Sequence, residues 1–381
     1  MKMRKKVSVL GCTGSIGKAT LDVIRHLPQK FQVFALAVRS NIDLLEEQIK
    51  EFRPEFAVVF DPDSAIVLQK RLPNTPILSG LDGLKAAAGH KDVDFVMLAM
   101  SGSIGLHPAL AAIHAKKQIG LANKEILVMA GEMISGLAKQ QGVELLPVDS
   151  EHSALFQCLR NEPLSSVRRL ILTASGGPFR KKNAEELEKV SLEEALCHPN
   201  WSMGPKITVD SSTLLNKGLE MIEARWLFEV EPERIDVIVH PQSVIHSLVE
   251  YVDGSILAQL SKPNMVLPIQ YALTYPERKP GLLAPFDFQA CSQLTFEPPD
   301  KKRFLCLQLA LDALKAGGSY PCALNAAGEI LVERFLSGCI SWIDIGRKLE
   351  KLMSSHRRSN MLSLDSILSV DCEMRELARQ A

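Results

Sequence analysis

Several features of secreted, membrane-bound and thiolate-metal proteins are missing from this sequence. The eight cysteines are scattered singly and no Cys-x-x-Cys pair occurs, which argues against a thiolate zinc site and for reduced thiols in a reducing compartment. Apolar runs stay far below the roughly 20 residues of a membrane-spanning helix and are typical of buried strands. We therefore expect a cytoplasmic protein with no membrane partner.

The sequence also lacks a net charge and a secretory leader. Acidic and basic residues number 44 each, so the balance offers no argument for a nucleic-acid partner or an acidic membrane surface. The basic start from Met1 to Lys6 passes directly into the short apolar run Val7–Leu10. With no long apolar region and no cleavage site, this start is a polar segment before the first strand rather than a signal peptide.

The length and composition are those of a globular protein with more than one domain. A chain of 381 residues, 46% hydrophobic and 23% charged, exceeds one ordinary core and predicts two or three domains. We expect an α/β protein with an N-terminal Rossmann-like parallel-sheet domain (1–147) and a central α+β catalytic domain (148–274). A linker (275–302) and a C-terminal helical bundle (303–381) follow.

Short apolar strands alternate with helical patterns up to about residue 147. The helical patterns include Ile16–Leu27 and Leu44–Phe52. The expected strands are Val7–Leu10, Gln32–Val38, Ala57–Phe60, Val93–Ala99, Gln118–Leu121 and Glu144–Val148. Strands that alternate with helices form βαβ units, because parallel neighbours need a crossover. The first domain should therefore contain a parallel sheet.

After residue 148 the pattern changes. The expected elements are a helical segment at 153–160, a strand at 169–174, a helix at 211–229 and strands at 235–239, 244–251 and 255–260. The polar stretch 176–207 has little periodicity, which is more typical of a functional lid than of a passive connector. Prolines make 275–302 a semi-rigid linker. Polar breaks near 317–321, 338–341 and 354–362 divide the remainder into helices of a small bundle.

The first chemical signal is a glycine-rich turn between a strand and a helix. Gly11, Gly14 and Gly17 follow the strand Val7–Leu10, and such glycines let the backbone approach a pyrophosphate at a helix N-terminus. A phosphate-binding P-loop is excluded, because five residues separate the outer glycines and Ala19 follows Lys18. A tight turn without a ligand stays the alternative.

The end of the second strand indicates which dinucleotide binds. NAD sites usually place a carboxylate there for the ribose hydroxyls, but this strand ends Val38-Arg39-Ser40-Asn41. Arginine followed by small polar residues suits a 2′-phosphate, so we favour NADP. Arg39 as an exposed turn residue is the alternative.

Carboxylates gather where the first two domains meet. Asp149 and Glu151 are two residues apart, so in an extended segment they point to the same side and could bind a hard divalent metal ion. They could equally cap the helix that follows. Hydroxyls from Ser211 onward, then Asn216 and Lys217, suggest a phosphate cradle at a helix start. Glu220 lies three residues after Lys217 and could complete the metal site or pair with the lysine.

Six motifs in this order resemble the 1-deoxy-D-xylulose 5-phosphate reductoisomerase family, and the resemblance runs through essentially the whole chain. They are Gly11 to Gly17, Leu121-Ala122-Asn123-Lys124-Glu125, Asp149-Ser150-Glu151-His152-Ser153, Thr173-Ala174-Ser175-Gly176-Gly177-Pro178-Phe179, His198-Pro199-Asn200-Trp201-Ser202-Met203-Gly204 and Ser211 to Glu220. One departure concerns the turn after the second strand, where family members often have Gly-Lys-Asn or Arg-Ser-Asn. This chain has Arg39-Ser40-Asn41, which agrees with a preference for NADP but leaves open which atom contacts the cofactor.

The resemblance implies a role for each motif. The NADPH contacts are Thr13, Gly14, Ser15, Ile16, Asn41, Asn123, Glu125 and Gly204, beside the proposed Arg39. The ligands of Mg²⁺ or Mn²⁺ are Asp149, Glu151 and Glu220. The substrate contacts are Lys124, Ser150, Glu151, Ser175, His198, Ser211, Asn216, Lys217 and Glu220. Lys124, Glu151 and His198 are the residues expected to act in catalysis, and Trp201 and Met203 to cover the substrate.

The resemblance further implies a homodimer that rearranges a sugar phosphate, 1-deoxy-D-xylulose 5-phosphate, and reduces the product with NADPH to 2-C-methyl-D-erythritol 4-phosphate, for isoprenoid synthesis. Simpler interpretations accompany it. His198 could be only a loop residue, Trp201 a core anchor, and Glu223 the ligand in place of Glu220. His240 and His246 should satisfy local hydrogen bonds. Two other functions fit the residues less well. A semialdehyde dehydrogenase would need a cysteine nucleophile with a histidine base, and no cysteine lies in such a setting. A non-catalytic NADP-binding regulator would not need three carboxylates, a phosphate cradle and a lid together.

Overall fold

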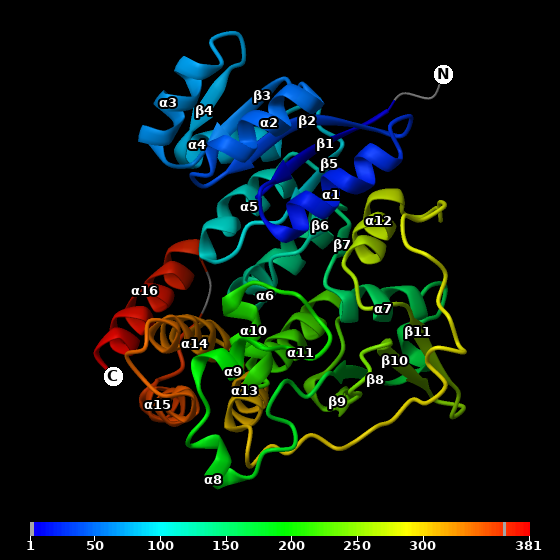
Figure 1. Cartoon of the computed structure of the whole chain (residues 1–381), viewed down its shortest axis with the longest axis vertical. Coiled ribbons are helices and arrows are strands. Elements are labelled where there is room, and N and C mark those ends of the chain that lie inside the picture. The colour runs from blue at the N-terminus through cyan, green and yellow to red at the C-terminus, as the bar shows by residue number, and fades with distance from the viewer. Residues whose placement is uncertain (1–3, 361–362) are drawn as a thin grey trace. The chain divides into compact units, whose positions relative to one another are not determined.

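The computed structural model describes residues 4–360 and 363–381. The first three residues of the predicted polar start, and two residues of the predicted break at 354–362, lie outside the described residues. The chain forms two compact units (Figure 1). Unit 1 comprises Met1–Ile126, Ile134–Ser153 and Met265–Ala284. Unit 2 comprises Leu127–Met133, Ala154–Asn264 and Pro285–Ala381.

Unit 1 is built on a seven-stranded parallel sheet with the order β4-β3-β2-β1-β5-β6-β7. Its strands are β1 (Lys5–Leu10), β2 (Phe31–Val38), β3 (Phe56–Val59), β4 (Ile77–Ser79), β5 (Phe95–Leu98), β6 (Gln118–Leu121) and β7 (Leu145–Pro147). The strand order changes direction at β1, so the carboxyl ends of β1 and β5 flank a switch point, where ligands bind in such sheets. The predicted α/β class is confirmed.

The helices of unit 1 lie on both faces of this sheet. They are α1 (Ser15–His26), α2 (Ile42–Phe52), α3 (Pro62–Arg71), α4 (Gly80–Gly89), α5 (Leu106–His114) after the short 3₁₀ turn Ser103–Gly105, part of α6 (Lys124–Gln141), and α12 (Val266–Thr274). Right-handed crossovers place α1 to α3 on one face and α4 and α5 on the other. In agreement, α2 packs on α3, α4 on α5, and α12 on α1.

Unit 2 contains a four-stranded mixed sheet with the order β11-β10-β8-β9. Its strands are β8 (Val167–Ala174), β9 (Ile235–Val239), β10 (Ile245–Tyr251) and β11 (Ile256–Leu260). β8 and β9 are parallel, whereas β10 is antiparallel to both β8 and β11. The helices of this part of unit 2 are the rest of α7 (Ser150–Cys158) from Ala154 onward, α8 (Ala184–Leu187), α9 (Leu192–Leu196), α10 (Pro205–Ser212) and α11 (Leu215–Phe228), with 3₁₀ turns at Leu164–Ser166 and Pro232–Arg234. α11 covers β8 and β9.

Four helices complete unit 2, as the polar breaks predicted. They are α13 (Leu305–Ala316), α14 (Tyr320–Leu336), α15 (Trp342–Ser355) and α16 (Leu364–Gln380). α14 packs against α15 and α16, and α13 packs against both α11 and α15. The C-terminal helices therefore share a core with the helix that carries the predicted Asn216, Lys217 and Glu220.

The structure differs from the sequence expectations at several elements. The predicted helix at 211–229 is confirmed over Leu215–Phe228 (α11), but its start is wrong: α10 ends at Ser212, and the left-handed Leu214 (φ 60°) separates the two helices. The stretch 176–207, which was predicted to be a lid with little periodicity, contains the short helices α8 and α9, each of which begins with a capping box. β4 and α12 were not expected. Residues 265–284 belong to unit 1, while the division into three functional domains stays a prediction.

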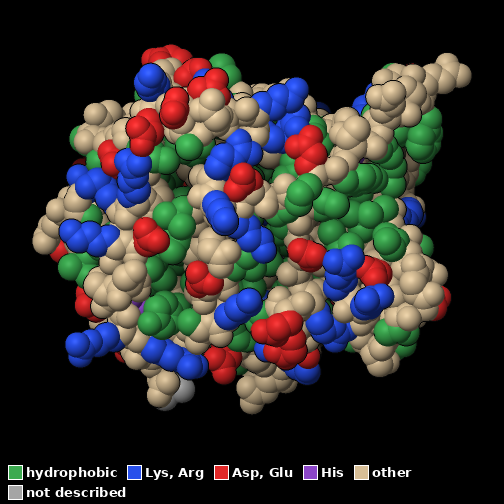
Figure 2. Space-filling model, turned by 90° about the horizontal axis from the view of Figure 1, so that it is seen from below, with side chains coloured by type: hydrophobic (Ala, Val, Ile, Leu, Met, Phe, Trp, Pro, Cys, Tyr) green, Lys and Arg blue, Asp and Glu red, His purple; other side chains and the backbone are tan. Residues whose placement is uncertain are grey.

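Within the described residues, no helix is long and apolar enough to cross a membrane. On the face shown in Figure 2, basic and acidic side chains are interspersed, and apolar side chains gather toward one side. This mixture agrees with the equal number of acidic and basic residues. All eight cysteines, each of which lies in the described part of the chain, are free thiols.

Candidate active site

The glycine-rich turn joins β1 to α1 in a form that requires glycine at two positions. Gly11 has φ +94°, and a Cβ there would lie 2.5 Å from the Ala99 carbonyl oxygen. A Cβ on Gly17 would lie 2.2 Å from the carbonyl oxygen of Gly11. The turn therefore packs against both the end of β5 and its own helix, which brings the N-terminus of α1 to the switch point of the sheet.

The N-terminus of α1 suits a phosphate group. Its N-cap is Gly14, and no described side chain accepts a hydrogen bond there. By contrast, Asn41 caps α2 and Asp61 caps α3 with side-chain oxygens. The first N–H groups of α1 therefore lack a side-chain cap and can donate to an anion. The predicted NADPH residues Thr13 to Ile16 all lie in this turn.

The end of β2 carries the residues expected to select NADP. Arg39 and Asn41 are exposed, and the Asn41 side-chain oxygen accepts a hydrogen bond from the Leu44 N–H at 3.4 Å. The amide nitrogen of Asn41 can still donate to a ligand. The Ser64 hydroxyl and N–H, with the charge of Arg39, lower the pKa of Asp61. Arg39 therefore lies near a carboxylate of the neighbouring strand end.

The end of β6 carries Asn123, Lys124 and Glu125 at the start of α6, all buried. Asn123 accepts a hydrogen bond from the Ile126 N–H and donates one to the Gly102 carbonyl. Its amide thus ties the start of α6 to the segment after β5. Its predicted contact with NADPH stays a prediction, as does that of Glu125.

The segment with Asp149, Ser150 and Glu151 was expected to be extended, but it forms the start of a helix. α7 begins at Ser150, so Asp149 directly precedes the helix and Glu151 lies in its first turn. The Asp149 carbonyl accepts a hydrogen bond from the Ser153 N–H, and the Ser150 hydroxyl donates to Glu151 at 2.5 Å. The helix-start alternative is therefore correct for the backbone, and both carboxylates remain at the carboxyl end of β7.

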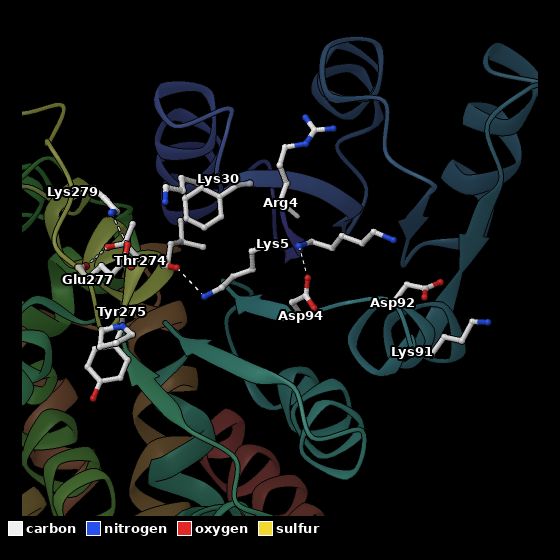
Figure 3. A pocket seen from close by; sticks show the side chains of 14 residues that line it. Arg4, Lys5, Lys30, Lys91, Asp92, Asp94, Thr274, Tyr275, Glu277 and Lys279 are labelled. Atoms are coloured by element: carbon white, nitrogen blue, oxygen red, sulfur yellow. Dashed lines mark hydrogen bonds and ion pairs between the residues drawn. The ribbon is translucent and has the colours of Figure 1, made fainter. Parts of the chain in front are cut away.

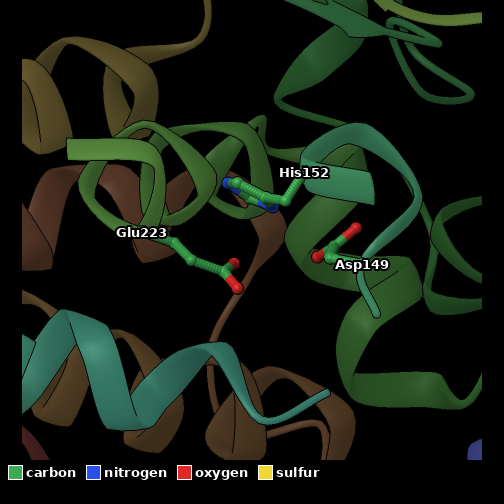
Figure 4. Close-up of side chains that lie close together, drawn as sticks. All are labelled: Asp149, His152 and Glu223. Atoms are coloured by element: carbon green, nitrogen blue, oxygen red, sulfur yellow. The ribbon is translucent and has the colours of Figure 1, made fainter. Parts of the chain in front are cut away.

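Lys124 and Asp149 form an ion pair, with 2.5 Å between Nζ and Oδ2. Both side chains are largely buried. Burial disfavours the charged carboxylate, but the charges of Lys124 and His152 outweigh it and hold the pKa of Asp149 well below its ordinary value. Figure 4 shows Asp149 and His152 at the start of α7, and it also labels Glu223 of α11 in unit 2. Asp149 is therefore ionised at neutral pH, as a metal ligand must be.

Ser211 lies at the end of a helix and not at its start, which corrects the predicted cradle. The left-handed Leu214 turns the chain between α10 and α11, and the Leu214 N–H bonds to the Ser211 carbonyl. The Thr213 hydroxyl then accepts a hydrogen bond from the Leu215 N–H. Ser211 and the first turn of α11, with Asn216 and Lys217, thus lie on either side of one tight turn.

The carboxylate of Glu220 is held by its two predicted neighbours. Lys217 forms an ion pair with one oxygen, and the Asn216 amide donates to the other at 2.6 Å. The side chains of Lys217 and Glu220 are only 5% and 1% exposed, so this is a buried pair in which each charge depends on the other. The pairing expected from the spacing is confirmed. A role of Glu220 as metal ligand stays a prediction.

Ser175 and His198 meet in unit 2. The Ser175 hydroxyl lies 2.9 Å from Nε2 of His198 and accepts a hydrogen bond from the Gly177 N–H. Nδ1 of His198 accepts from the N–H groups of Asn200 and Trp201, so the neutral ring carries its proton on Nε2 and donates to Ser175. Burial lowers the pKa of His198 to about 4. The Ser175 hydroxyl proton is therefore left to donate elsewhere.

The loop from His198 to Gly204 rests on the sheet of unit 2. The Asn200 amide donates to Ser243 at 3.0 Å, and the Trp201 ring meets His246 edge-on with centroids 6.1 Å apart. His246 also bonds to the Ser261 hydroxyl, and His240 to the Thr295 carbonyl. These two histidines make local hydrogen bonds, as expected. Gly204 is exposed and is the N-cap of α10.

The donor atoms of the predicted metal site suit a hard divalent cation. All three ligands are carboxylates, which Mg²⁺ and Mn²⁺ prefer. Asp149 and Glu220 each form an ion pair with a lysine, so both carboxylates are ionised groups that already have a cation beside them. Asp149 and Glu151 lie in unit 1 and Glu220 in unit 2, and the binding of one ion by all three stays a prediction.

The structure also indicates roles for residues to which the sequence alone assigned none. The charge of His152 helps to lower the pKa of Asp149. Ser212 and Trp342 form a buried hydrogen bond next to Ser211. His152 lies inside a recognised motif and so could have been suspected. Trp342 lies 130 residues from Ser212, and nothing in the sequence links the two.

A cavity of about 670 Å³ lies at the opposite, amino-terminal edge of the unit 1 sheet. It is lined by Arg4, Lys5, Lys6, Lys30, Phe31, Lys91, Asp92, Asp94, Leu273, Thr274, Tyr275, Pro276, Glu277 and Lys279. Its basic groups do not converge (Figure 3). Lys5 donates to Gln118 and the Leu273 carbonyl, and Lys279 pairs with Glu277. We assign no ligand to this cavity.

Comparisons with known proteins agree with this arrangement. The family profile 1-deoxy-D-xylulose 5-phosphate reductoisomerase matches residues 7–131. Its C-terminal domain profile matches residues 145–228, and a DXP reductoisomerase C-terminal domain profile matches 260–377. The 1-deoxy-D-xylulose 5-phosphate reductoisomerase of Protochlamydia amoebophila is 59% identical, over 99% of this chain and 98% of its own length.

Solved structures agree as well. The Zymomonas mobilis reductoisomerase in complex with NADPH has a TM-score of 0.94 at 42% identity and covers 99% of both chains. A DOX-P reductoisomerase in complex with NADPH, fosmidomycin and magnesium also has a TM-score of 0.94, at 41% identity, covering 99% of this chain and 98% of its own. The chain therefore belongs to the family of 1-deoxy-D-xylulose 5-phosphate reductoisomerases.

Proposed function

We propose that the residues described above carry out the reaction for which this family is named. The chain converts 1-deoxy-D-xylulose 5-phosphate to 2-C-methyl-D-erythritol 4-phosphate, a step of isoprenoid precursor synthesis, with NADPH and Mg²⁺ or Mn²⁺. The observation that carries the residue assignment is the pairing of each predicted substrate lysine with a predicted metal-binding carboxylate, Lys124 with Asp149 and Lys217 with Glu220.

The substrate phosphate would be bound by unit 2. Ser175, whose oxygen accepts from both Gly177 and His198, has its hydroxyl proton left to donate to a phosphate oxygen. Ser211, Asn216 and Lys217 flank the turn at Leu214 and would add two neutral donors and one positive charge. Fixing the phosphate in this way orients the reacting carbons and lowers the entropic part of the barrier.

Asp149, Glu151 and Glu220 would hold the divalent cation, which supplies Lewis-acid polarisation of the substrate's carbonyl and hydroxyl oxygens. With Asp149 and Glu220 engaged in this way, Lys124 and Lys217 can turn their ammonium groups toward substrate oxygens. Ser150 and Glu151 lie beside Asp149 at the start of α7 and would contact the substrate there.

The uncapped N-terminus of α1 would bind the pyrophosphate of NADPH, which supplies the hydride that reduces the rearranged aldehyde. Arg39 and Asn41 would contact the 2′-phosphate and adenosine side, and Asn123, Glu125 and Gly204 other parts of the cofactor. Trp201 and Met203 would cover the substrate when the loop from His198 to Gly204 closes, which excludes water from the aldehyde.

A spectrophotometric assay tests this function. NADPH absorbance is followed with 1-deoxy-D-xylulose 5-phosphate in the presence of Mn²⁺, and again with EDTA. Oxidation that requires both substrate and metal is the expected result. A folded, NADPH-binding protein that shows no oxidation in the presence of the metal would overturn the proposal.

We further propose that the protein is a cytoplasmic homodimer. The edge strand β11 exposes Ile256 and Leu257, 52% and 48% accessible, and the adjoining turn exposes Val252. Among the described strands, β11 pairs only with β10, so its other edge can pair with the same strand of a second copy. The eight free thiols suit a reducing compartment.

A further inference from the structure

The C-terminal helices contact both walls of the predicted phosphate pocket through one side chain. Trp342, the first residue of α15, is buried. Its indole N–H donates to the Ser212 hydroxyl oxygen at 2.8 Å. Its ring meets the ring of Phe179 edge-on, with centroids 5.2 Å apart. Ser212 adjoins Ser211, and Phe179 follows the Gly176-Gly177 turn after Ser175.

The bond from Trp342 fixes the orientation of Ser212. The Ser212 hydroxyl donates its proton to the Val209 carbonyl at 2.7 Å and accepts the indole proton on its oxygen. Ser212 is fully buried, so loss of either partner would leave a polar group without its hydrogen bond. The last turn of α10, and with it the backbone of Ser211, is thereby attached to α15.

The two walls also touch each other directly. Gly177 has φ +67°, and a Cβ there would lie 2.9 Å from the Ser211 carbonyl oxygen and 3.1 Å from the Ser212 Cα. The backbone of the glycine turn thus rests on the end of α10. A shift of either wall would therefore move the donors of Ser175 and Ser211 relative to each other.

Trp342 itself is held firmly. Ser341 and Asp344 form a capping box at the start of α15, with the Ser341 hydroxyl 2.6 Å from the Asp344 carboxylate. The ring of Phe304, which precedes α13, also meets the indole edge-on, with centroids 6.3 Å apart. The indole is therefore a rigid connection between the helical bundle and the pocket.

We propose that Trp342 is a positioning residue for substrate phosphate binding: its indole N–H orients Ser212 and its ring supports Phe179, so that the donors of Ser175 and Ser211 converge. This inference rests on the proposed phosphate pocket and deepens it. It gives the C-terminal helical domain a part in substrate affinity and not only in stability.

The test compares Trp342→Phe, which keeps an aromatic ring but removes the N–H, with Ser212→Ala, which removes its acceptor. Tyr320→Phe is the matched control, because it also deletes one aromatic hydrogen-bond donor, to the His356 carbonyl, within the same helices. In both test variants the KM for 1-deoxy-D-xylulose 5-phosphate should rise about five- to tenfold, as loss of one net hydrogen bond predicts. The KM for NADPH and kcat should stay within about twofold.

Inorganic phosphate provides an independent readout. Its inhibition constant against the substrate should rise by the same factor as the KM in both variants. The double variant should be no worse than the poorer single variant, because both changes delete the same bond. If Trp342→Phe does not fold, as judged by circular dichroism, Ser212→Ala decides alone.

The inference is overturned if the folded variants keep the wild-type KM and phosphate inhibition, or if Tyr320→Phe shows the same change. It is also overturned if kcat and the NADPH KM change as much as the substrate KM, which would indicate general destabilisation. Wild-type turnover is measured first. Its absence would contradict the proposed function, whereas a normal wild type with unchanged variants contradicts only the role of Trp342.

Discussion

At the scale of single residues, two lysines each balance the charge of one largely buried carboxylate. Lys124 and Lys217 each lie against a carboxylate that the family resemblance assigns to the metal. Removing one partner of such a buried pair leaves an uncompensated charge and costs about 3 to 5 kcal/mol. A neutral amide of the same shape also removes the charge, but it keeps an accepting oxygen for the lysine and leaves no cavity, so it is a better probe than truncation to alanine.

Glu220→Gln should abolish most turnover while NADPH binding is retained. The change removes one charged ligand oxygen donor, and loss of metal-assisted catalysis predicts a fall in kcat of about a hundredfold or more. The NADPH residues at the glycine turn lie in unit 1 and are not altered. Turnover with titrated Mn²⁺ and NADPH fluorescence measure the two effects. Glu223→Gln, one turn further along α11, is the control; if it loses activity and Glu220→Gln does not, the ligand assignment is wrong.

His198 should remain neutral at pH values well below those at which histidine side chains ordinarily take up a proton. Its pKa is lowered to about 4 by burial, so the folded protein holds the neutral ring while an unfolded chain would take up a proton near pH 6.5. The contribution of His198 to stability is thus complete above about pH 6.5 and is lost as the pH falls toward 4.

Nitrogen chemical shifts of the His198 ring measure this directly. They should report a proton on Nε2 at neutral pH and a titration midpoint near 4. His114 lies at the end of α5 in unit 1 and gives a second ring signal for comparison in the same spectrum. A His198 midpoint near 6.5, or a proton on Nδ1, would contradict the hydrogen bond to Ser175.

Sequence reasoning reached many of these residues but not all their relations. The spacing of three residues made the pair of Lys217 and Glu220 foreseeable. The pair of Lys124 and Asp149 arises because β6 and β7 are parallel neighbours whose carboxyl ends meet. Residues so far apart in sequence carry no local signal of that contact.

At the scale of elements, the order and extent of strands followed from their apolar patterns, whereas breaks inside helical sequence did not. Leucine is a good helix former, so Leu214 carries no local sign of its left-handed backbone. Packing decides there: Leu214 is buried, and Leu215 contacts the position of Gly328 in α14. The three-residue strand β4 and the helix α12, which contains Pro268, were too short or too irregular for a periodic signal.

Gly17→Ala should disrupt the nucleotide-binding turn. The added methyl would lie 2.2 Å from the Gly11 carbonyl oxygen, so the first turn of α1 must move away from β1. We expect a loss of NADPH affinity and about 1 to 3 kcal/mol of stability, as for overpacking of a tight site. Gly14→Ala is the comparison, because its methyl would meet only the Gly11 carbonyl oxygen at 3.4 Å. Isothermal titration and thermal melts measure both; equal behaviour of the two variants would refute the steric argument.

At the scale of the whole molecule, the exposed edge of β11 predicts the effect of one charge on assembly. Leu257→Glu places a carboxylate on a strand that we propose pairs with a second copy. The dissociation constant of the dimer should rise by about tenfold or more, because a buried unpaired charge opposes strand pairing. Sedimentation at a series of protein concentrations measures this constant. Ile66→Glu is the control, since Ile66 is also exposed (57%) but lies on α3 in unit 1. A dimer that persists unchanged in Leu257→Glu would exclude this edge as the interface.

The fold class was predictable from the sequence because each strand and helix of the sheet domain carries its own pattern. The membership of residues 265–284 in unit 1 was not predictable, since it depends on long-range packing. α12 lies against α1, β6 and β7, all made much earlier in the chain. A contact between segments so distant has no counterpart in local composition.

This threading has a consequence for how the protein is made. The Lys5 side chain at the start of β1 bonds to the carbonyl of Leu273, 268 positions later. A nascent chain therefore cannot finish its nucleotide-binding unit until nearly three-quarters of the polypeptide has been translated. Until then the face of α1 that α12 covers is accessible to chaperones and proteases. Chains that terminate early would keep this face exposed, and chaperones and proteases would recognise them by it.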